Sequence, residues 1–316
     1  MSAAMDIIVD IILPVFGIVL IGYVAARAGF FPEAAGKGLA YFVFNFAIPP
    51  LLFRSMVTQT LPDPIEWSFL ASYFGGGVVA CLLGGLLSKA LFRRDFAAAV
   101  ITGATSGVSN LMLLAIPLVL TTFGEVATFP IFLLLAINAP IMVMTTTLLI
   151  EGRHGGGENI RALPRNLAKS LVTNPIVMAL ILGVIWNLCG WKLPRVVDVL
   201  AMSLGQAALP CAVFSMGVSL ASYRIAGAVG EIGMASTIKL VLHPAVVWLL
   251  STHVFVVEPL WRDIAILAAA APAGVNVYMV ATRYDAGANH AAATMLVSTL
   301  FSVLTIGIVL HLLGAR

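Results

Sequence analysis

The sequence predicts an all-α integral membrane protein with ten transmembrane helices arranged as two inverted five-helix repeats. Three observations lead there. Of the 316 residues, 61% are hydrophobic and 10% are charged, with a mean hydropathy of +1.06, whereas soluble domains carry about 25% charged residues. Ten apolar stretches have the length of about 20 residues that a bilayer core requires. Proline and glycine positions recur between the two halves of the chain.

The ten apolar stretches fall into two sets of five, separated by a polar segment at 151–169. The first set is expected at 6–27, 36–57, 67–90, 97–122 and 126–150, and the second at 171–191, 196–220, 228–254, 261–284 and 289–313. The predicted organisation is therefore a first repeat at 1–150, a loop at 151–169 and an inverted second repeat at 170–316.

Basic residues gather on one side of this arrangement. Alternate connections carry eleven Lys and Arg residues, against five on the other side, with Lys239 inside a span. Basic connections favour the cytoplasm. We therefore expect a multi-pass protein of the cell inner (plasma) membrane, with both termini outside and the 151–169 loop in the cytoplasm.

An internal repeat supports the two halves. Residues of the first two spans recur 161 positions later: Pro14, Gly22, Gly29, Pro49 and Phe53 return as Pro175, Gly183, Gly190, Pro210 and Phe214. Because each half has an odd number of spans, the halves must cross the membrane in opposite senses. Inverted repeats of this kind are typical of secondary transporters.

Two of the spans are interrupted by residues that weaken a helix. The stretch 103–117 and the stretch 271–285 contain the expected helix-break residues Gly107, Pro117, Pro272 and Gly274. A break within hydrocarbon is tolerated only where protein buries it or where it lines a cavity. Paired breaks in corresponding positions are the best sequence indication of a transporter's substrate site.

Two asparagines are the leading candidates for that site. Asn110 and Asn276 each follow a Gly-Val pair, at the start of the resumed helix. Free backbone amides and the positive end of a helix dipole suit an anion, and a neutral side-chain amide adds hydrogen bonds. The alternative is that each asparagine only satisfies loosened backbone. Asn138 and Pro49 could likewise be packed at kinks or contact the substrate.

Lys239 is an ionisable residue predicted to lie within the eighth span. Such a group is a functional hypothesis by default: it could attract an anion or pair with an acid. The alternative is that its long stem snorkels to the surface. By contrast, no Asp or Glu falls clearly at mid-membrane in this assignment, which argues against a carboxylate proton relay.

Other functional classes lack their motifs. The sequence has neither a nucleotide-binding G-x-x-x-x-G-K-[ST] loop nor a G-x-S-x-G or H-E-x-x-H motif, so it is not expected to be an enzyme. Its three cysteines, in apolar segments, have no metal-ligand spacing. Basic residues are not clustered among aromatics, as nucleic-acid binding requires. We expect no cofactor, no metal and no nucleic-acid partner.

Several segments resemble the auxin efflux carrier family. SNLMLLAIPLVL is similar to that family's fourth-helix motif, and NFAIPPLLF, TNPIV, IKLVLHPAV and PAGVNVYMVATRYD are similar to its second, sixth, eighth and ninth helices, in the same order. The short central loop is like that of the bacterial, malonate-transporter-like members. The chain departs from the plant PIN-type members at Ser109 and Asn276, where those place proline.

The resemblance implies broken, crossing fourth and ninth helices, a scaffold domain, a moving transport domain and often a homodimer. It also implies that Asn110 meets a substrate carboxylate and that Ile48 lines the pocket. The candidate substrate-binding residues are therefore Asn110, Asn276, Ser106, Ser109, Ile48, Pro49, Asn138 and Lys239.

The expected function is secondary transport of a small organic anion through the lipid bilayer, by alternating access at the helix crossover. The substrate would be a carboxylate or dicarboxylate such as malonate or malate, or an auxin-like acid. Two alternatives stay open: a sodium-coupled carrier like the bile acid symporters, and a non-transporting membrane receptor.

Overall fold

The protein is built from apolar helices, as expected for an integral membrane protein. The computed structural model describes residues 8–58, 66–153, 165, 169, 172–223 and 228–314, so most of the predicted 151–169 loop lies outside the described residues. Seven described helical segments are long and apolar enough to cross a membrane, and Phe96–Gly107 and Pro175–Leu188 are shorter apolar helices. A multi-pass membrane protein is thus confirmed, while the number of ten spans stays a prediction.

The helices of the first half include several π-helical turns. These turns, and one described 3-10 turn, carry the label η. In chain order the elements are η1 (Ile8–Ile12), α2 (Leu13–Arg27), α3 (Glu33–Phe42), η2 (Val43–Ala47), α4 (Ile48–Thr58), α5 (Trp67–Phe92), α6 (Phe96–Gly107), η3 (Leu111–Ala115), α7 (Ile116–Phe123), η4 (Gly124–Ala127, the 3-10 turn) and α8 (Thr128–Arg153).

The second half is likewise built from α-helices with π-helical turns between some of them. They are α10 (Pro175–Leu188), α11 (Arg195–Ser222), α12 (Val229–Thr237), η5 (Ile238–Leu242), α13 (His243–Leu249), η6 (Leu250–Val254), α14 (Pro259–Ala270), α15 (Val275–Arg283) and α16 (Ala288–Leu312).

Side-chain caps fix where several helices begin. The Asp95 carboxylate accepts a hydrogen bond from the amide of Ala98 at the start of α6, at 2.8 Å. Asn174 caps α10 in the same way, by accepting from the amide of Ile176 at 2.9 Å. Such caps satisfy amides that the first helical turn leaves unpaired.

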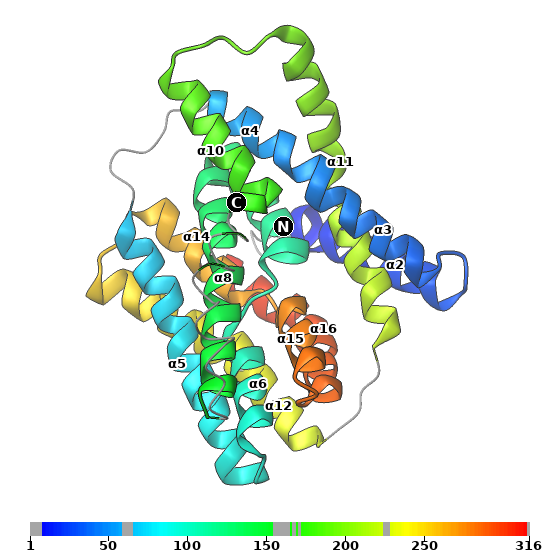
Figure 1. The fold of residues 1–316 in the computed structure, drawn as a ribbon, viewed down its shortest axis with the longest axis vertical. Helices are drawn as coiled ribbons and strands as arrows, with labels where there is room; N and C mark the ends of the chain where they lie inside the picture. The colour runs from blue at the N-terminus through cyan, green and yellow to red at the C-terminus, as the bar shows by residue number, and fades with distance from the viewer. Residues whose placement is uncertain are drawn as a thin grey trace.

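The helices pack as two groups (Figure 1). One group contains α2, α3, α4, α10 and α11, and the other contains α5, α6, α8 and α12 to α16. Within the first group the helices approach closely at glycines: a Cβ atom at Gly22 would collide with the carbonyl of Phe214, and one at Gly183 with Met56 and the carbonyl of Phe53. Each group combines helices from both halves of the sequence.

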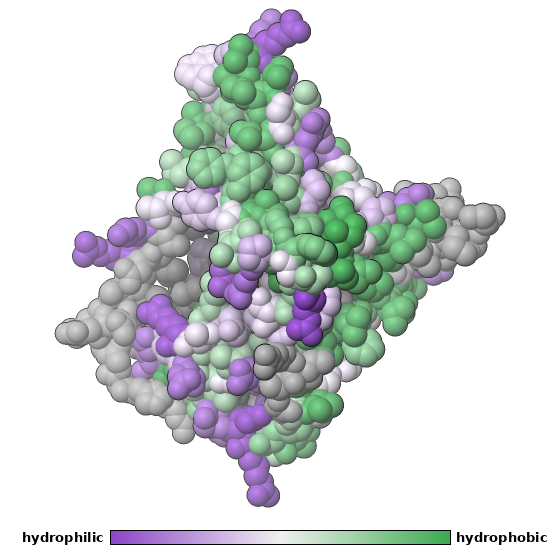
Figure 2. All heavy atoms as spheres, turned by 90° about the vertical axis from the view of Figure 1, so that its right-hand side faces the viewer, coloured by the Kyte–Doolittle hydropathy of each residue, from purple (hydrophilic) through white to green (hydrophobic). Residues whose placement is uncertain are grey.

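The surface is apolar over much of its area, as a bilayer-embedded protein requires. Large hydrophobic side chains such as Leu20, Ile21, Leu86 and Leu304 are exposed by more than half, and apolar side chains cover much of the face in Figure 2. The interior, in contrast, buries many hydroxyl groups together with Glu231, Lys239 and two histidines.

Candidate functional site

Two helices are interrupted inside the second group. α6 ends at Gly107, and the chain runs in a non-helical conformation until η3 begins at Leu111. Likewise, α14 ends at Ala270, and α15 begins at Val275. Residues 108–110 and 271–274 are all buried. The sequence predicted a helix break in each of these two regions, and both are present. Pro117, which was predicted to be a break residue, instead lies in α7, the helix that resumes after the first break.

The two interruptions pair with each other, and we call residues 108–110 and 271–274 together the crossing. The amide of Asn110 donates to the carbonyl of Pro272 at 2.8 Å, and the amide of Gly274 donates to the carbonyl of Val108 at 3.0 Å. Ser109 and Ala273 thereby form an isolated antiparallel bridge. The pairing satisfies backbone groups that the broken helices release, as a hydrocarbon environment demands.

Glycine is required where the backbones meet. A Cβ atom at Gly274 would lie 2.9 Å from the carbonyl oxygen of Ser109. At Gly107 it would overlap the carbonyl of Gly77 and the sulfur of Cys81. These contacts explain why two of the predicted break residues are glycines.

Asn110 caps the helix that follows the first break. Its side-chain oxygen accepts from the amide of Leu113 at 3.2 Å, and the side chain is 3% exposed. Its side-chain nitrogen lies 3.9 Å from the sulfur of Met216 on α11, and a thioether is a weak acceptor. Met216 belongs to the first helix group, so Asn110 lies where the groups meet.

Lys239 is fully buried behind the crossing, which excludes snorkelling of its side chain to the surface. Its ammonium donates to the Ser109 hydroxyl at 3.0 Å and to the carbonyl of Ala269 at 2.6 Å, and it lies 3.1 Å from Nδ1 of His243. Ala269 is in the last turn of α14, where the helix dipole favours a cation. The ammonium thus links η5, α14 and the crossing.

Other candidates lie on α15, α6 and α4. Asn276 is the second residue of α15 and is partly exposed. Ser106 is buried and donates to the carbonyl of Thr102 within α6 at 2.9 Å. Ile48 is buried at the start of α4, with Pro49 next to it, in the first helix group.

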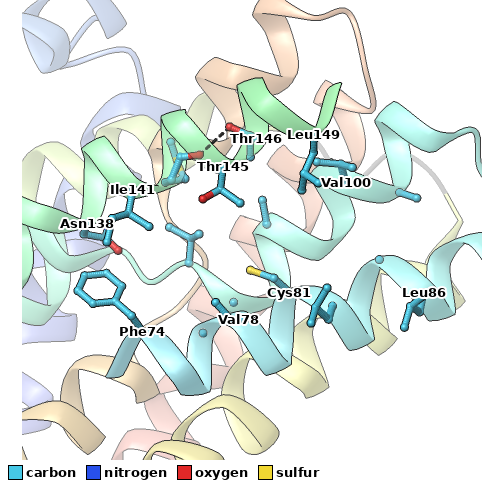
Figure 3. A pocket seen from close by; sticks show the side chains of 18 of the residues that line it. Phe74, Val78, Cys81, Leu86, Val100, Asn138, Ile141, Thr145, Thr146 and Leu149 are labelled. Atoms are coloured by element: carbon cyan, nitrogen blue, oxygen red, sulfur yellow. Dashed lines mark hydrogen bonds between the residues drawn. The ribbon is translucent and has the colours of Figure 1, made fainter. Parts of the chain in front are cut away.

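A cavity of about 320 Å³ adjoins one side of the crossing (Figure 3). α5, α6 and α8 form its walls, with Cys81 on α5 and Thr145 on α8 across from each other. Gly107 and Asn138 line it, whereas Asn110, Asn276 and Lys239 do not. The walls are mainly apolar, so the cavity by itself offers little to hold a charge.

One buried acid, Glu231, was not predicted from the sequence. Glu231 is in the first turn of α12 and is 0% exposed. Its predicted span began at 228, which placed this carboxylate at a membrane boundary rather than inside the protein. A signal was nevertheless present: Glu231, Lys239 and His243 are spaced by multiples of four, so they share one helix face.

Two buried, paired helix breaks inside a bundle of apolar helices are the architecture of a membrane transporter, and the comparisons identify the family. The chain belongs to the family described as "Membrane transport protein", whose model matches residues 7–310. The resemblance to the auxin efflux carriers is thereby confirmed, and the protein is a transporter rather than an enzyme.

Three relatives show how far the similarity extends. A Rhizobium meliloti protein named "Putative malonate transporter" is 28% identical over 97% of this chain and 96% of its own length. The Arabidopsis thaliana "Auxin efflux carrier component 8" is 32% identical over 37% of this chain and 33% of its own. The mouse "Lysosomal cholesterol signaling protein" is 29% identical over 66% of this chain and 25% of its own.

Proposed function

We propose that the protein is a secondary carrier for a small organic anion, which binds at the crossing and is moved by alternating access. The observation that carries the proposal is the pairing of two buried helix breaks beside Asn110 and the Lys239 ammonium. In transporters built from inverted repeats, broken helices present their ends to the substrate near the middle of the bilayer.

Asn110 is proposed to donate a hydrogen bond to the substrate carboxylate. Among the described residues, the acceptor of its side-chain nitrogen is the Met216 sulfur at 3.9 Å. A carboxylate oxygen is a far stronger acceptor than a thioether. Movement of α11 away from η3 would therefore free this nitrogen for the anion, and its return would expel the anion.

Lys239 is proposed to supply positive charge behind the binding position. Its ammonium is held one residue away from Asn110, through the Ser109 hydroxyl. With Asn276 near the N-terminus of α15, the crossing would combine one cation, two side-chain amides and two helix N-termini. This combination suits a carboxylate. Ser106, Ile48, Pro49 and Asn138 remain candidates for the surrounding walls.

A repeated contact supports the proposed ten-helix, inverted-repeat organisation. Gly22 packs against Phe214, and Gly183 packs against Phe53. Gly183 and Phe214 are the residues 161 positions after Gly22 and Phe53. A pseudo-two-fold axis would generate this reciprocal pair of contacts. We propose accordingly that 1–150 and 170–316 are the two repeats, with both termini outside the inner membrane.

Malonate is the first substrate to test, since a relative of similar length carries it in its name. Malate and an auxin-like acid are the next candidates. A second reading, a receptor that does not transport, is kept because the match to the mouse signaling protein covers two thirds of this chain. Measurement of substrate flux separates the carrier from the receptor, because a receptor would bind a ligand without moving it.

We also propose that the protein forms a homodimer.

The test is uptake of labelled malonate, malate and indole-3-acetate into proteoliposomes, with wild type and Asn110→Ala. Loss of a hydrogen bond to a charged group costs about 1.5–3 kcal/mol, so substrate affinity should fall roughly ten- to a hundredfold. Asn276→Ala should reduce transport to a smaller extent, because that side chain is partly exposed.

The matched control is Asn45→Ala. Among the residues that the structure describes, this amide donates to the carbonyl of Tyr41, one helical turn earlier. The control variant should transport as the wild type does. Wild-type rates in both Asn110→Ala and Asn276→Ala would show that these amides are structural and that the anion binds elsewhere.

A further inference from the structure

A buried carboxylate connects α12, α5 and the N-terminal part of α6. Glu231 on α12 accepts hydrogen bonds from the Ser88 hydroxyl of α5 at 2.6 Å and from the Thr102 hydroxyl of α6 at 3.1 Å. The Nε group of Arg94, just before α6, forms an ion pair with it at 2.8 Å. Arg94 is 38% exposed while Glu231 is 0% exposed, so the arginine connects the carboxylate to the surface.

His290 faces the same carboxylate from α16 without bonding to it. Its Nδ1 atom lies 3.7 Å from Oε2 of Glu231, beyond hydrogen-bond length. Among the described residues, this Nδ1 atom has no hydrogen-bond partner, although the side chain is only 6% exposed. A proton on Nδ1 would convert the contact into a charge-assisted hydrogen bond. Imidazole is also the side chain that gains or loses charge near neutral pH.

The other charged groups on or next to the elements packed against α16 are either bonded to other partners or exposed. Glu231 is on α12, and Arg94 and Asp95 precede α6, which Asp95 caps. Lys239 on η5 is bonded at the crossing. Arg262 and Asp263 on α14 pair with each other, and Arg283 at the end of α15 lies over the ring of Tyr284. Asp10 is on η1. Glu231 is therefore the acid positioned to form an ion pair with a protonated His290.

Two polar helix faces lead from this pair to the crossing. On α16, His290, Thr294 and Ser298 follow at intervals of four, and the Ser298 hydroxyl accepts from the amide of Ala273 at 3.1 Å. On α12 and η5, Glu231 is followed eight residues later by Lys239, which bonds Ser109. At about 1.5 Å per residue the separation is roughly 12 Å. A change in the charge of His290 or Glu231 can thus act on both breaks of the crossing, through Ser298 at Ala273 and through Lys239 at Ser109.

We propose that His290 and Glu231 form a proton-binding site whose occupancy is coupled to anion movement at the crossing. This inference rests on the proposed carrier function and adds its coupling ion. A proton enters from water beside Arg94, binds Nδ1 of His290 and is held by Glu231. On the other side of the membrane the same proton leaves Nδ1 for water, so one proton moves with each transport cycle.

The first measurement detects the proton without using any substrate. In detergent, with ¹⁵N-histidine, the His290 imidazole signals are assigned by their loss in His290→Gln and followed from pH 5 to 8. We expect them to titrate, with a midpoint that moves to lower pH in Glu231→Gln because the carboxylate no longer stabilises the charge. His311, exposed on the same helix, is the internal control, and its midpoint should stay unchanged. A His290 signal that does not respond between pH 5 and 8 would overturn the proposal.

The second measurement tests coupling. Proteoliposomes with wild type, His290→Gln and the control His311→Gln are assayed for malonate uptake with and without an imposed pH gradient, and for malonate counterflow without a gradient. The gradient should stimulate wild type and His311→Gln, whereas His290→Gln should lose that stimulation and retain counterflow. Unchanged stimulation in His290→Gln, or wild-type transport indifferent to the gradient, would refute coupling. Absence of both uptake and counterflow with every acid in wild type would instead refute the carrier function, while the titration still reports the proton site.

Discussion

At the scale of single residues, the most demanding feature is the buried ammonium of Lys239. A charge inside a membrane protein is costly unless it is paired or hydrogen-bonded. Here its acceptors are the Ser109 hydroxyl and the Ala269 carbonyl, and the His243 imidazole lies beside it. None of these groups carries a full negative charge. In the proposed carrier, a positive charge on Lys239 would therefore have no bonded acid, among the described residues, to neutralise it before an anionic substrate arrives.

We predict that Lys239→Gln weakens binding of a carboxylate by about tenfold or more, which corresponds to about 1.4 kcal/mol. The amide keeps polar contacts but removes the charge. Binding of malonate to purified protein, measured by the shift in thermal unfolding temperature, is the assay. Lys37→Gln is the control, because that lysine is exposed and pairs with Glu33 at 2.7 Å.

The control should bind like wild type. Equal affinity in Lys239→Gln and wild type would mean that the ammonium only holds the crossing together. In that case the Gln variant should still unfold at a lower temperature, since the Ala269 carbonyl loses its donor.

The sequence predicted single residues well where local chemistry determines them. Gly107 and Asn110 stand out because Gly, Ser and Asn weaken a helix in place, and the structure has its break between them. Met216 could not be found in this way, because its contact with Asn110 depends on how α11 packs against η3, 106 residues away along the chain. Glu231 was misplaced because a span boundary is uncertain by about a helical turn.

At the scale of elements, the crossing depends on close approach of α5 and α6. Gly103 and Gly107 of α6 pack directly on the α5 backbone at Cys81 and Gly77. Small residues let membrane helices approach in this way. Sequence patterns placed the interruptions but not the π-helical turns, since widening a turn is a response to packing that leaves no simple residue signature.

We predict that Gly107→Ala destabilises the protein by about 1–3 kcal/mol, the usual cost of overpacking. The added methyl group would overlap backbone as well as the Cys81 sulfur, and backbone cannot move aside. Gly38→Ala is the control, because nothing lies within 4 Å of a Cβ atom there and alanine favours a helix. Thermal unfolding in detergent should show a clear loss for Gly107→Ala only; equal stability would mean that the crossing is looser than the structure indicates.

At the scale of the whole molecule, the two helix groups are assembled from both halves of the chain (Figure 1). Apolar periodicity could not have predicted this, because it gives the spans but not their neighbours. The repeat offset comes closer, since residues 161 apart make reciprocal contacts. The crossing belongs to one group and Met216 to the other, so in the proposed carrier relative movement of the groups would open or close access to Asn110.

Orientation in the membrane is the last prediction, and it follows from the excess of basic residues on one side. A cysteine at Gly152, where a side chain meets open space, should react with an impermeant maleimide only from the cytoplasm. One at Lys192, exposed between α10 and α11, should react only from outside. Both are introduced after replacement of Cys81, Cys189 and Cys211. An odd number of crossings between the two sites requires opposite sides, so labelling of both from the same side would contradict the ten-helix inverted repeat.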